Sequence, residues 1–156
     1  MKSGISLVEM AQEIQRQNDL KADYMLDTRS LRLEPFGGGL YLNAYDQSGD
    51  YAVEPLEVNA IAHRQIGTHL KIPAAYYDKM LEEYPELLAQ NVNAWFQREP
   101  AGGGVRTIEG TARAFLSNRY RRIDNLDIAG IVLPVLQEME GMHFESCQLT
   151  DSRMYI

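Results

Sequence analysis

The feature that most constrains the fold is a change of hydrophobic period at Asn59. Over residues 31–56, apolar side chains follow the two-residue alternation of strands, and after Asn59 they recur at helical spacing as far as Phe96. Pro73 and Pro85 divide the helical stretch, and proline suits the first turn of a helix. Asn59 itself is a residue type that caps helices. The segment 59–99 is therefore predicted to form three short helices in the middle of the chain.

Strand-like patterns flank this helical segment on both sides. A helix over residues 5–20, begun by a capping box of Ser6 and Glu9, opens the chain. Three strands of an antiparallel meander are then expected, at 31–36, 40–44 and 51–56. After the helices, the glycine run 102–104 is expected to be a mobile loop.

A second group of strands follows the glycine run. Residues 105–117 predict a hairpin that turns at Glu109–Gly110. Strand alternation places Arg113 and Phe115 on one face, and Ala112, Ala114 and Leu116 on the other. A helix capped by Asp124 or Asn125 should come next. The remaining elements are expected to be a strand over 144–149, a turn near Asp151 and a strand-like run over 154–156.

These patterns predict an α+β fold, in which an antiparallel sheet is packed with helices and carries a central three-helix segment. We expect a single domain over 1–156, made of a helix and meander (1–58), the helical segment (59–99) and a last part (105–156). Because the chain stops in an apolar strand-like run, we expect it to be the N-terminal portion of a longer protein.

Composition favours a protein of the cytoplasm without a membrane partner. The single cysteine, Cys147, fits a reducing compartment. The N-terminus lacks the apolar run of a signal peptide, and no apolar stretch is long enough to span a bilayer. The net charge of −7 argues against general coating of DNA, although it leaves room for a local binding groove.

One short segment opposes that acidic balance. Residues 106–122 hold five of the eleven arginines and one acid, Glu109. Guanidinium groups bind phosphate bidentately and stack on bases, and aromatic side chains among them are typical of single-stranded nucleic-acid binders. The candidate binding residues are Arg113, Phe115, Arg119, Tyr120, Arg121 and Arg122. Arg106 is the weakest candidate of the cluster, and an equally open alternative is that the arginines pair with the protein's own carboxylates.

Other chemistry has weaker support. His143, Glu145 and Cys147 share one face of an expected strand, but a fourth metal ligand is not visible nearby, so no metal or cofactor is expected. Asp124 and Asp127 could serve acid–base chemistry, yet a helix cap is the better interpretation. No nucleophile or phosphate-loop motif emerges, and the sequence leans against an enzyme.

The helices around Gly67 have the spacing of a helix-turn-helix motif. The second helix carries only Lys79 as a basic residue, with Asp78 and Glu82 beside it. Because that charge has the wrong sign for a DNA duplex, we favour a structural helical hairpin in which Gly67 lies where the two helices cross.

Three runs of sequence, AHRQIGTHLKIPAAYYDKM, PELLAQNVNAWF and VRTIEGTARAFLSNRYRRIDNLDI, resemble the phage/plasmid-like protein family, also called domain of unknown function 932. The similarity extends from about Ala62 to the C-terminus, and residues 113–124 resemble the family's signature. The resemblance implies a mobile genetic element in a bacterial host. It supplies no catalytic residues.

The leading hypothesis is a phage or plasmid accessory protein that binds nucleic acid, preferably single-stranded, in recombination or annealing. The alternative is a non-catalytic interaction module, such as a host-defence antagonist, whose acidic helices with Glu82, Glu83 and Glu86 meet a phage or host protein. An oligomer is compatible with either hypothesis. An enzyme acting on a phosphorylated substrate ranks last.

Overall fold

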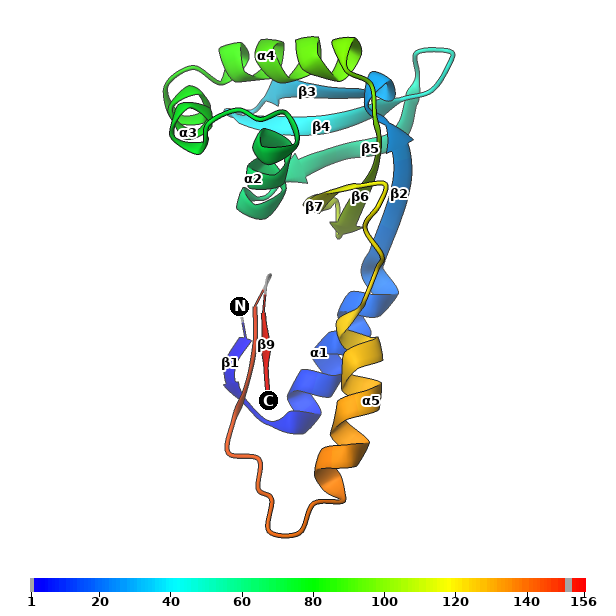
Figure 1. Ribbon diagram of the computed structural model, residues 1–156, viewed down its shortest axis with the longest axis vertical. Coiled ribbons are helices and arrows are strands. Elements are labelled where there is room, and N and C mark those ends of the chain that lie inside the picture. Colours follow the sequence, from blue (N-terminus) through cyan, green and yellow to red (C-terminus); the bar gives the residue numbers. More distant parts are fainter. Residues whose placement is uncertain (1, 151–152) are drawn as a thin grey trace. The chain divides into compact units, whose positions relative to one another are not determined.

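The protein forms two compact units, each with its own sheet and helices (Figure 1). The computed structural model describes residues 2–150 and 153–156. Unit 1 combines Met1–Lys21 with Arg121–Ile156, and unit 2 is the continuous segment Ala22–Tyr120. The predicted α+β class is confirmed. The units do not coincide with the three parts expected from the sequence, because the two ends of the chain belong to the same unit.

Unit 2 is built on a six-stranded sheet with the order β2-β6-β7-β5-β4-β3. The strands are β2 (Lys21–Asp27), β3 (Leu31–Phe36), β4 (Gly39–Tyr45), β5 (Tyr51–Val58), β6 (Gly102–Ile108) and β7 (Thr111–Ser117), with the 3₁₀ turn η1 (Thr28–Ser30) after β2. Strands β3, β4 and β5 form the predicted antiparallel meander, and β6 and β7 form the predicted hairpin. Strands β5 and β7 pair in parallel, so the sheet is mixed.

The central helices are α2 (Ala60–His69), α3 (Ala74–Glu83) and α4 (Pro85–Arg98). Their starts follow the predicted signals: the Asn59 side chain accepts from the Ala62 N–H at 2.9 Å, and Pro85 occupies the first turn of α4. Helix α2 packs against β7 and α4 against β3. Side chains from both helices and from the sheet form one core, including Leu33, Leu42, Ile66, Leu88, Val92, Phe96, Val105 and Phe115.

The glycine run 102–104 begins strand β6, and the expected mobile loop is wrong. A Cβ on Gly103 would lie 3.1 Å from the Leu116 carbonyl oxygen and 3.4 Å from the Phe115 ring. The missing side chain therefore lets β6 approach β7 and the Phe115 ring closely, which is a known use of glycine within strands.

Unit 1 contains β1 (Lys2–Ile5), α1 (Leu7–Leu20), α5 (Asn125–Gln137), β8 (Cys147–Leu149) and β9 (Met154–Tyr155). The strands form a sheet with the order β1-β8-β9. The capping box of Ser6 and Glu9 is present at α1, and Asp124 forms one with Asp127 at α5. The core contains Met10, Ile14, Ala129, Cys147 and Leu149. The turn expected near Asp151 lies outside the described residues.

Candidate nucleic-acid interface

Arg106 is part of the interior of unit 2. It is 8% exposed, and its Nε donates to Asp23 Oδ1 at 3.1 Å. A buried arginine with a carboxylate partner is costly to uncover, because each charge would lose its counter-ion. Arg106 is therefore a structural residue, in line with its place as the weakest candidate of the cluster.

Phe115 does not offer a surface for stacking. Its side chain is 3% exposed, and its ring stacks on Phe96 with centroids 5.8 Å apart and meets His69 edge-on at 5.3 Å. The backbone N–H of Phe115 also donates a hydrogen bond to the Gln65 side chain, at 2.7 Å. The expectation that Phe115 stacks on a base is wrong, because the residue belongs to the hydrophobic core.

Arg113 and Phe115 were expected on one strand face, and a β-bulge overturns that prediction. Arg106 pairs with Ala114 and Thr107 pairs with Ala112, so Arg113 is an extra residue in β7. An extra residue interrupts simple alternation. Consequently Ala112 and Phe115 are both buried, whereas Arg113 is only half-buried.

The remaining candidates lie in a short stretch without helix or strand, Arg119–Arg122, here called the connector. All four residues are exposed, and Tyr120 is 49% exposed. The Tyr120 N–H donates to the Ser117 carbonyl at 3.0 Å, which forms a turn after β7. Arg119 and Arg121 make no hydrogen bond or ion pair with any described residue.

Arg122 leads into a small charged network at the start of α5. Its Nε contacts Asp124 Oδ2 at 3.1 Å, and Lys21 Nζ contacts the same oxygen at 2.6 Å. Asp124 is 7% exposed, and its backbone N–H donates to Asp127 at 3.2 Å. Asp124 and Asp127 thus serve as helix caps, as the sequence favoured. The role of Lys21 could not be predicted, since 103 positions separate it from Asp124.

The three metal-ligand types near the C-terminus do not form a cluster. Cys147 is 2% exposed in the unit 1 core, while His143 and Glu145 precede β8 and are exposed. Within residues 2–150 and 153–156, no three His, Cys, Asp or Glu side chains are placed to hold a metal ion. None of the helices in this part of the chain has the length and apolarity needed to cross a bilayer.

A buried histidine–tyrosine pair was not identified from the sequence. His63 Nδ1 lies 2.8 Å from the Tyr77 hydroxyl, and the two side chains are 8% and 2% exposed. Burial lowers the pKa of His63 to about 4 and raises the pKa of Tyr77, so both groups are neutral near pH 7. Gly67 faces the same ring, because a Cβ added at Gly67 would lie 2.9 Å from Cδ2 of Tyr77. This confirms the predicted close crossing of α2 and α3.

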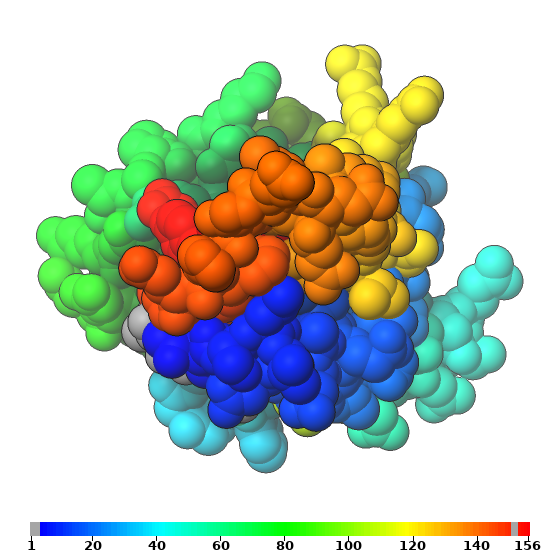
Figure 2. Space-filling view, turned by 90° about the horizontal axis from the view of Figure 1, so that it is seen from below, coloured from blue at the N-terminus to red at the C-terminus, as the bar shows by residue number. Residues whose placement is uncertain are grey.

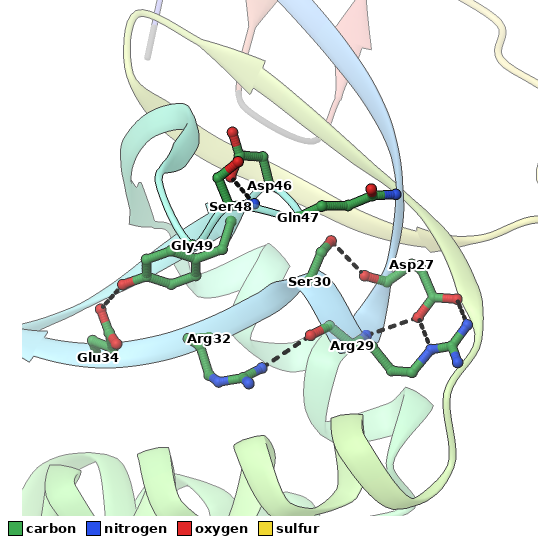
Figure 3. Close-up of a pocket in the computed structure, with 10 residues that line it drawn as sticks. Asp27, Arg29, Ser30, Arg32, Glu34, Asp46, Gln47, Ser48 and Gly49 are labelled. Atoms are coloured by element: carbon green, nitrogen blue, oxygen red, sulfur yellow. Dashed lines mark hydrogen bonds and ion pairs between the residues drawn. The ribbon is translucent and has the colours of Figure 1, made fainter.

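A second polar feature of unit 2 is an open pocket of about 840 Å³ beside η1 and the β4–β5 turn (Figure 3). Two arginines and three acids line it, but the arginines are already engaged. Arg29 forms two hydrogen bonds with Asp27, at 3.1 and 3.0 Å, and Arg32 donates to the carbonyl oxygens of Arg29 and Leu31. Because Asp27 pairs with Arg29 and backbone carbonyls hold Arg32 by its Nη1, the pocket is a weaker anion site than the connector.

Glu34 and Tyr45 form the opposite wall of this pocket. The Tyr45 hydroxyl donates to Glu34 Oε2 at 2.8 Å, and the Asn43 amide donates to the same oxygen. Burial and the neighbouring carboxylate raise the pKa of Tyr45 to about 12, so it is a hydrogen-bond donor near pH 7. The wall therefore consists of neutral donors around one carboxylate.

Comparisons with known proteins do not assign this arrangement. No protein-family model matches the chain. No curated protein and no solved structure matches it either. The functional argument therefore depends on the geometry of the two units.

Proposed function

We propose that the protein binds single-stranded nucleic acid through the connector. The observation that carries this proposal is that Arg119 and Arg121 are exposed and lack partners among the described residues, next to the half-exposed ring of Tyr120. Unengaged guanidinium groups retain all their donors for phosphate, and an accessible ring provides a face for a base. The buried residues Arg106 and Phe115 are excluded from this site.

Single strands suit this segment better than a duplex. The whole chain has a net charge of −7, so long-range repulsion opposes contact with a wide phosphate surface. A flexible strand can approach a few residues and present its bases, whereas the bases of a duplex are stacked on one another. We propose that Tyr120 stacks on one base while Arg119 and Arg121 contact adjoining phosphates, with Arg122 beside them. The contribution of Arg113, which is half-buried, is smaller.

The biological setting follows from the sequence resemblance. We propose an accessory protein of a phage or plasmid that acts in the cytoplasm of a bacterial host, for example in recombination or strand annealing. Such a protein would need to hold strands, which agrees with a segment that contains guanidinium donors and an aromatic ring.

The direct test is fluorescence anisotropy of a labelled oligothymidine with the full chain over a series of salt concentrations. Replacing both Arg119 and Arg121 by Ala should weaken binding. It should also lower the slope of log affinity against log salt by about 1.4, because each phosphate contact on a single strand contributes about 0.7. Tyr120→Ala should cost about 1–3 kcal/mol of binding free energy with little change in the slope.

The matched control removes two exposed positive charges outside the connector, by Lys79→Ala with Arg98→Ala. This variant changes the net charge as much as the connector variant does, but it should bind almost as the parent protein does, because Lys79 and Arg98 lie outside the connector. Equal losses of oligothymidine affinity in the two variants would show a general charge effect and would exclude the connector as the site. Absence of oligothymidine binding by the parent protein at low salt would exclude the function.

A protein-interaction module is the second candidate, and one observation favours it. Helix α5 exposes Ile128, Ile131 and Val135, with Ile131 71% accessible. Apolar side chains gathered on one exposed helix face are typical of protein interfaces. A stoichiometric complex with a purified host or phage protein, combined with no oligonucleotide binding, would favour a module such as a host-defence antagonist.

A further inference from the structure

Helix α5 is apolar on two opposite sides. Leu126, Ala129 and Leu133 face the unit 1 core. Ile128, Ile131 and Val135 lie about half a turn away at 3.6 residues per turn, and they are 38%, 71% and 58% exposed. A helix with this distribution is usually buried on both sides. Figure 2 shows part of the orange surface that the α5 region contributes.

The exposed positions are arranged symmetrically along the helix. Ile131 is the central residue of α5, which spans Asn125–Gln137, and Ile128 and Val135 flank it. Two further exposed apolar residues, Ile123 and Met139, lie eight positions before and after Ile131, and they are 63% and 56% exposed. A two-fold axis through Ile131 would therefore bring each apolar residue of an antiparallel helix near an apolar residue of its partner.

The charges at the two ends of the helix have opposite signs. Arg121 and Arg122 precede α5, and together with Lys21 they outnumber the acids Asp124 and Asp127 at its start. Glu138 and Glu140 follow the helix and are exposed. In an antiparallel pair, the basic end of one helix lies beside the acidic end of the other, and the helix dipoles also align favourably. In a parallel pair, like charges would face each other. This complementarity identifies a second copy of the chain as the occupant.

We propose that two copies of this protein associate through α5, as an antiparallel helix pair centred on Ile131. Such an interface is isologous, because the same surface serves on both copies and each contact occurs twice. The helix is about 20 Å long at 1.5 Å per residue and carries Ile128, Ile131 and Val135, while Ile123 and Met139 lie just beyond its two ends. Arg121 belongs both to the connector and to the basic end of this interface, whereas Ile131 belongs to the interface alone. Ile131→Asp therefore separates loss of the dimer from loss of nucleic-acid binding.

Sedimentation equilibrium of the full chain, over roughly a hundredfold range of concentration, tests the proposal by mass action. The parent protein should be a dimer. Ile131→Asp should weaken dimerisation roughly a hundredfold or more, because two charges would enter the apolar centre of a symmetric interface. The matched control is Val8→Asp, on α1 of the same unit, where Val8 is 66% exposed. It should leave the dimer intact.

Charge exchange then tests the antiparallel direction. Glu140→Arg should weaken the dimer by placing like charges together, Arg121→Glu should do the same, and the two changes combined should restore it. Circular dichroism of each variant checks that the helices are retained. A monomeric parent protein would overturn the proposal, as would a dimer that Ile131→Asp leaves unchanged. A combined variant that dimerises more weakly than either single variant would overturn the antiparallel arrangement.

Discussion

At the residue scale, side chains of the same type in one short segment have opposite environments. Arg106 and Arg121 are only fifteen positions apart, yet one is buried against Asp23 and the other is exposed. Asp23 lies on β2, which no sequence pattern indicated. The composition of the segment could therefore be recognised from the sequence, but the assignment of its members to core or surface depends on strand neighbours that are distant in the chain.

His63 is a second residue whose environment governs its chemistry, and it should make stability dependent on pH. Its folded pKa of about 4 lies below the ordinary value of 6.5, so the folded state favours the neutral ring. The contribution of His63 to the free energy of unfolding is complete above pH 6.5 and decreases as pH falls toward 4, because the unfolded chain binds the proton more readily. The loss should be on the order of 3 kcal/mol, at about 1.4 kcal/mol per pH unit.

Urea denaturation at a series of pH values measures this effect. His63→Gln removes the titrating group, so the difference in unfolding free energy between parent and variant should shrink as pH falls from 6.5 to 4. His143→Gln is the control, because His143 is exposed in unit 1. A difference that stays constant over this interval would contradict the buried, neutral state of His63.

At the element scale, local capping signals were the reliable part of the sequence. Asn59 and Pro85 begin their helices as predicted, and Ser6 caps α1. Strand β2, an edge strand of the sheet, was missed because its sequence KADYMLD lacks a regular alternation of apolar and polar residues. Strand β6 was mistaken for a loop because of its glycines. These two strands acquire their structure from neighbours, so propensity alone could not reveal them.

The two helical glycines Gly67 and Gly130 should respond in opposite ways to the same substitution. In α2, a methyl group at Gly67 would lie 2.9 Å from Tyr77, whose ring is held by burial and by His63. Gly67→Ala should therefore lower the free energy of unfolding by about 1–3 kcal/mol. In α5, nothing lies within 4 Å of a methyl group added at Gly130. Gly130→Ala should therefore raise the free energy of unfolding by up to about 1 kcal/mol.

Chemical denaturation followed by far-ultraviolet circular dichroism measures both glycine variants under identical conditions. If Gly67→Ala were stabilising, the close packing of α2 against the Tyr77 ring would be incorrect. The second variant controls for the general preference of helices for alanine over glycine.

At the scale of the whole molecule, unit 2 is an insertion between the two halves of unit 1. Its sheet, its three helices and its core all come from Ala22–Tyr120. The chain leaves unit 1 after Lys21 and returns before Asp124, and these two residues form an ion pair within unit 1 at 2.6 Å. The sequence predicted the elements on each side of this insertion but not their association, since no local pattern links residues so far apart.

A fragment containing only residues 22–120 should fold by itself. Its hydrophobic core is complete within that range, and roughly one hundred residues suffice for a stable domain. The fragment should unfold cooperatively with heat, whereas a fragment of residues 121–156 should show no cooperative transition, because Met10 and Ile14 of its core are absent. A disordered 22–120 fragment, judged by circular dichroism and amide hydrogen exchange, would contradict this.

The discontinuity of unit 1 also determines the order of events on the ribosome. Synthesis proceeds from the N-terminus, so unit 2 has all its strands and helices once Tyr120 has emerged. Helix α1 must wait until α5 and β8 have been translated, with its apolar side chains Met10 and Ile14 uncovered in the meantime. The nascent chain thus carries an amphipathic segment with uncovered apolar side chains until α5 and β8 emerge, and chaperones that bind such segments can act in that interval.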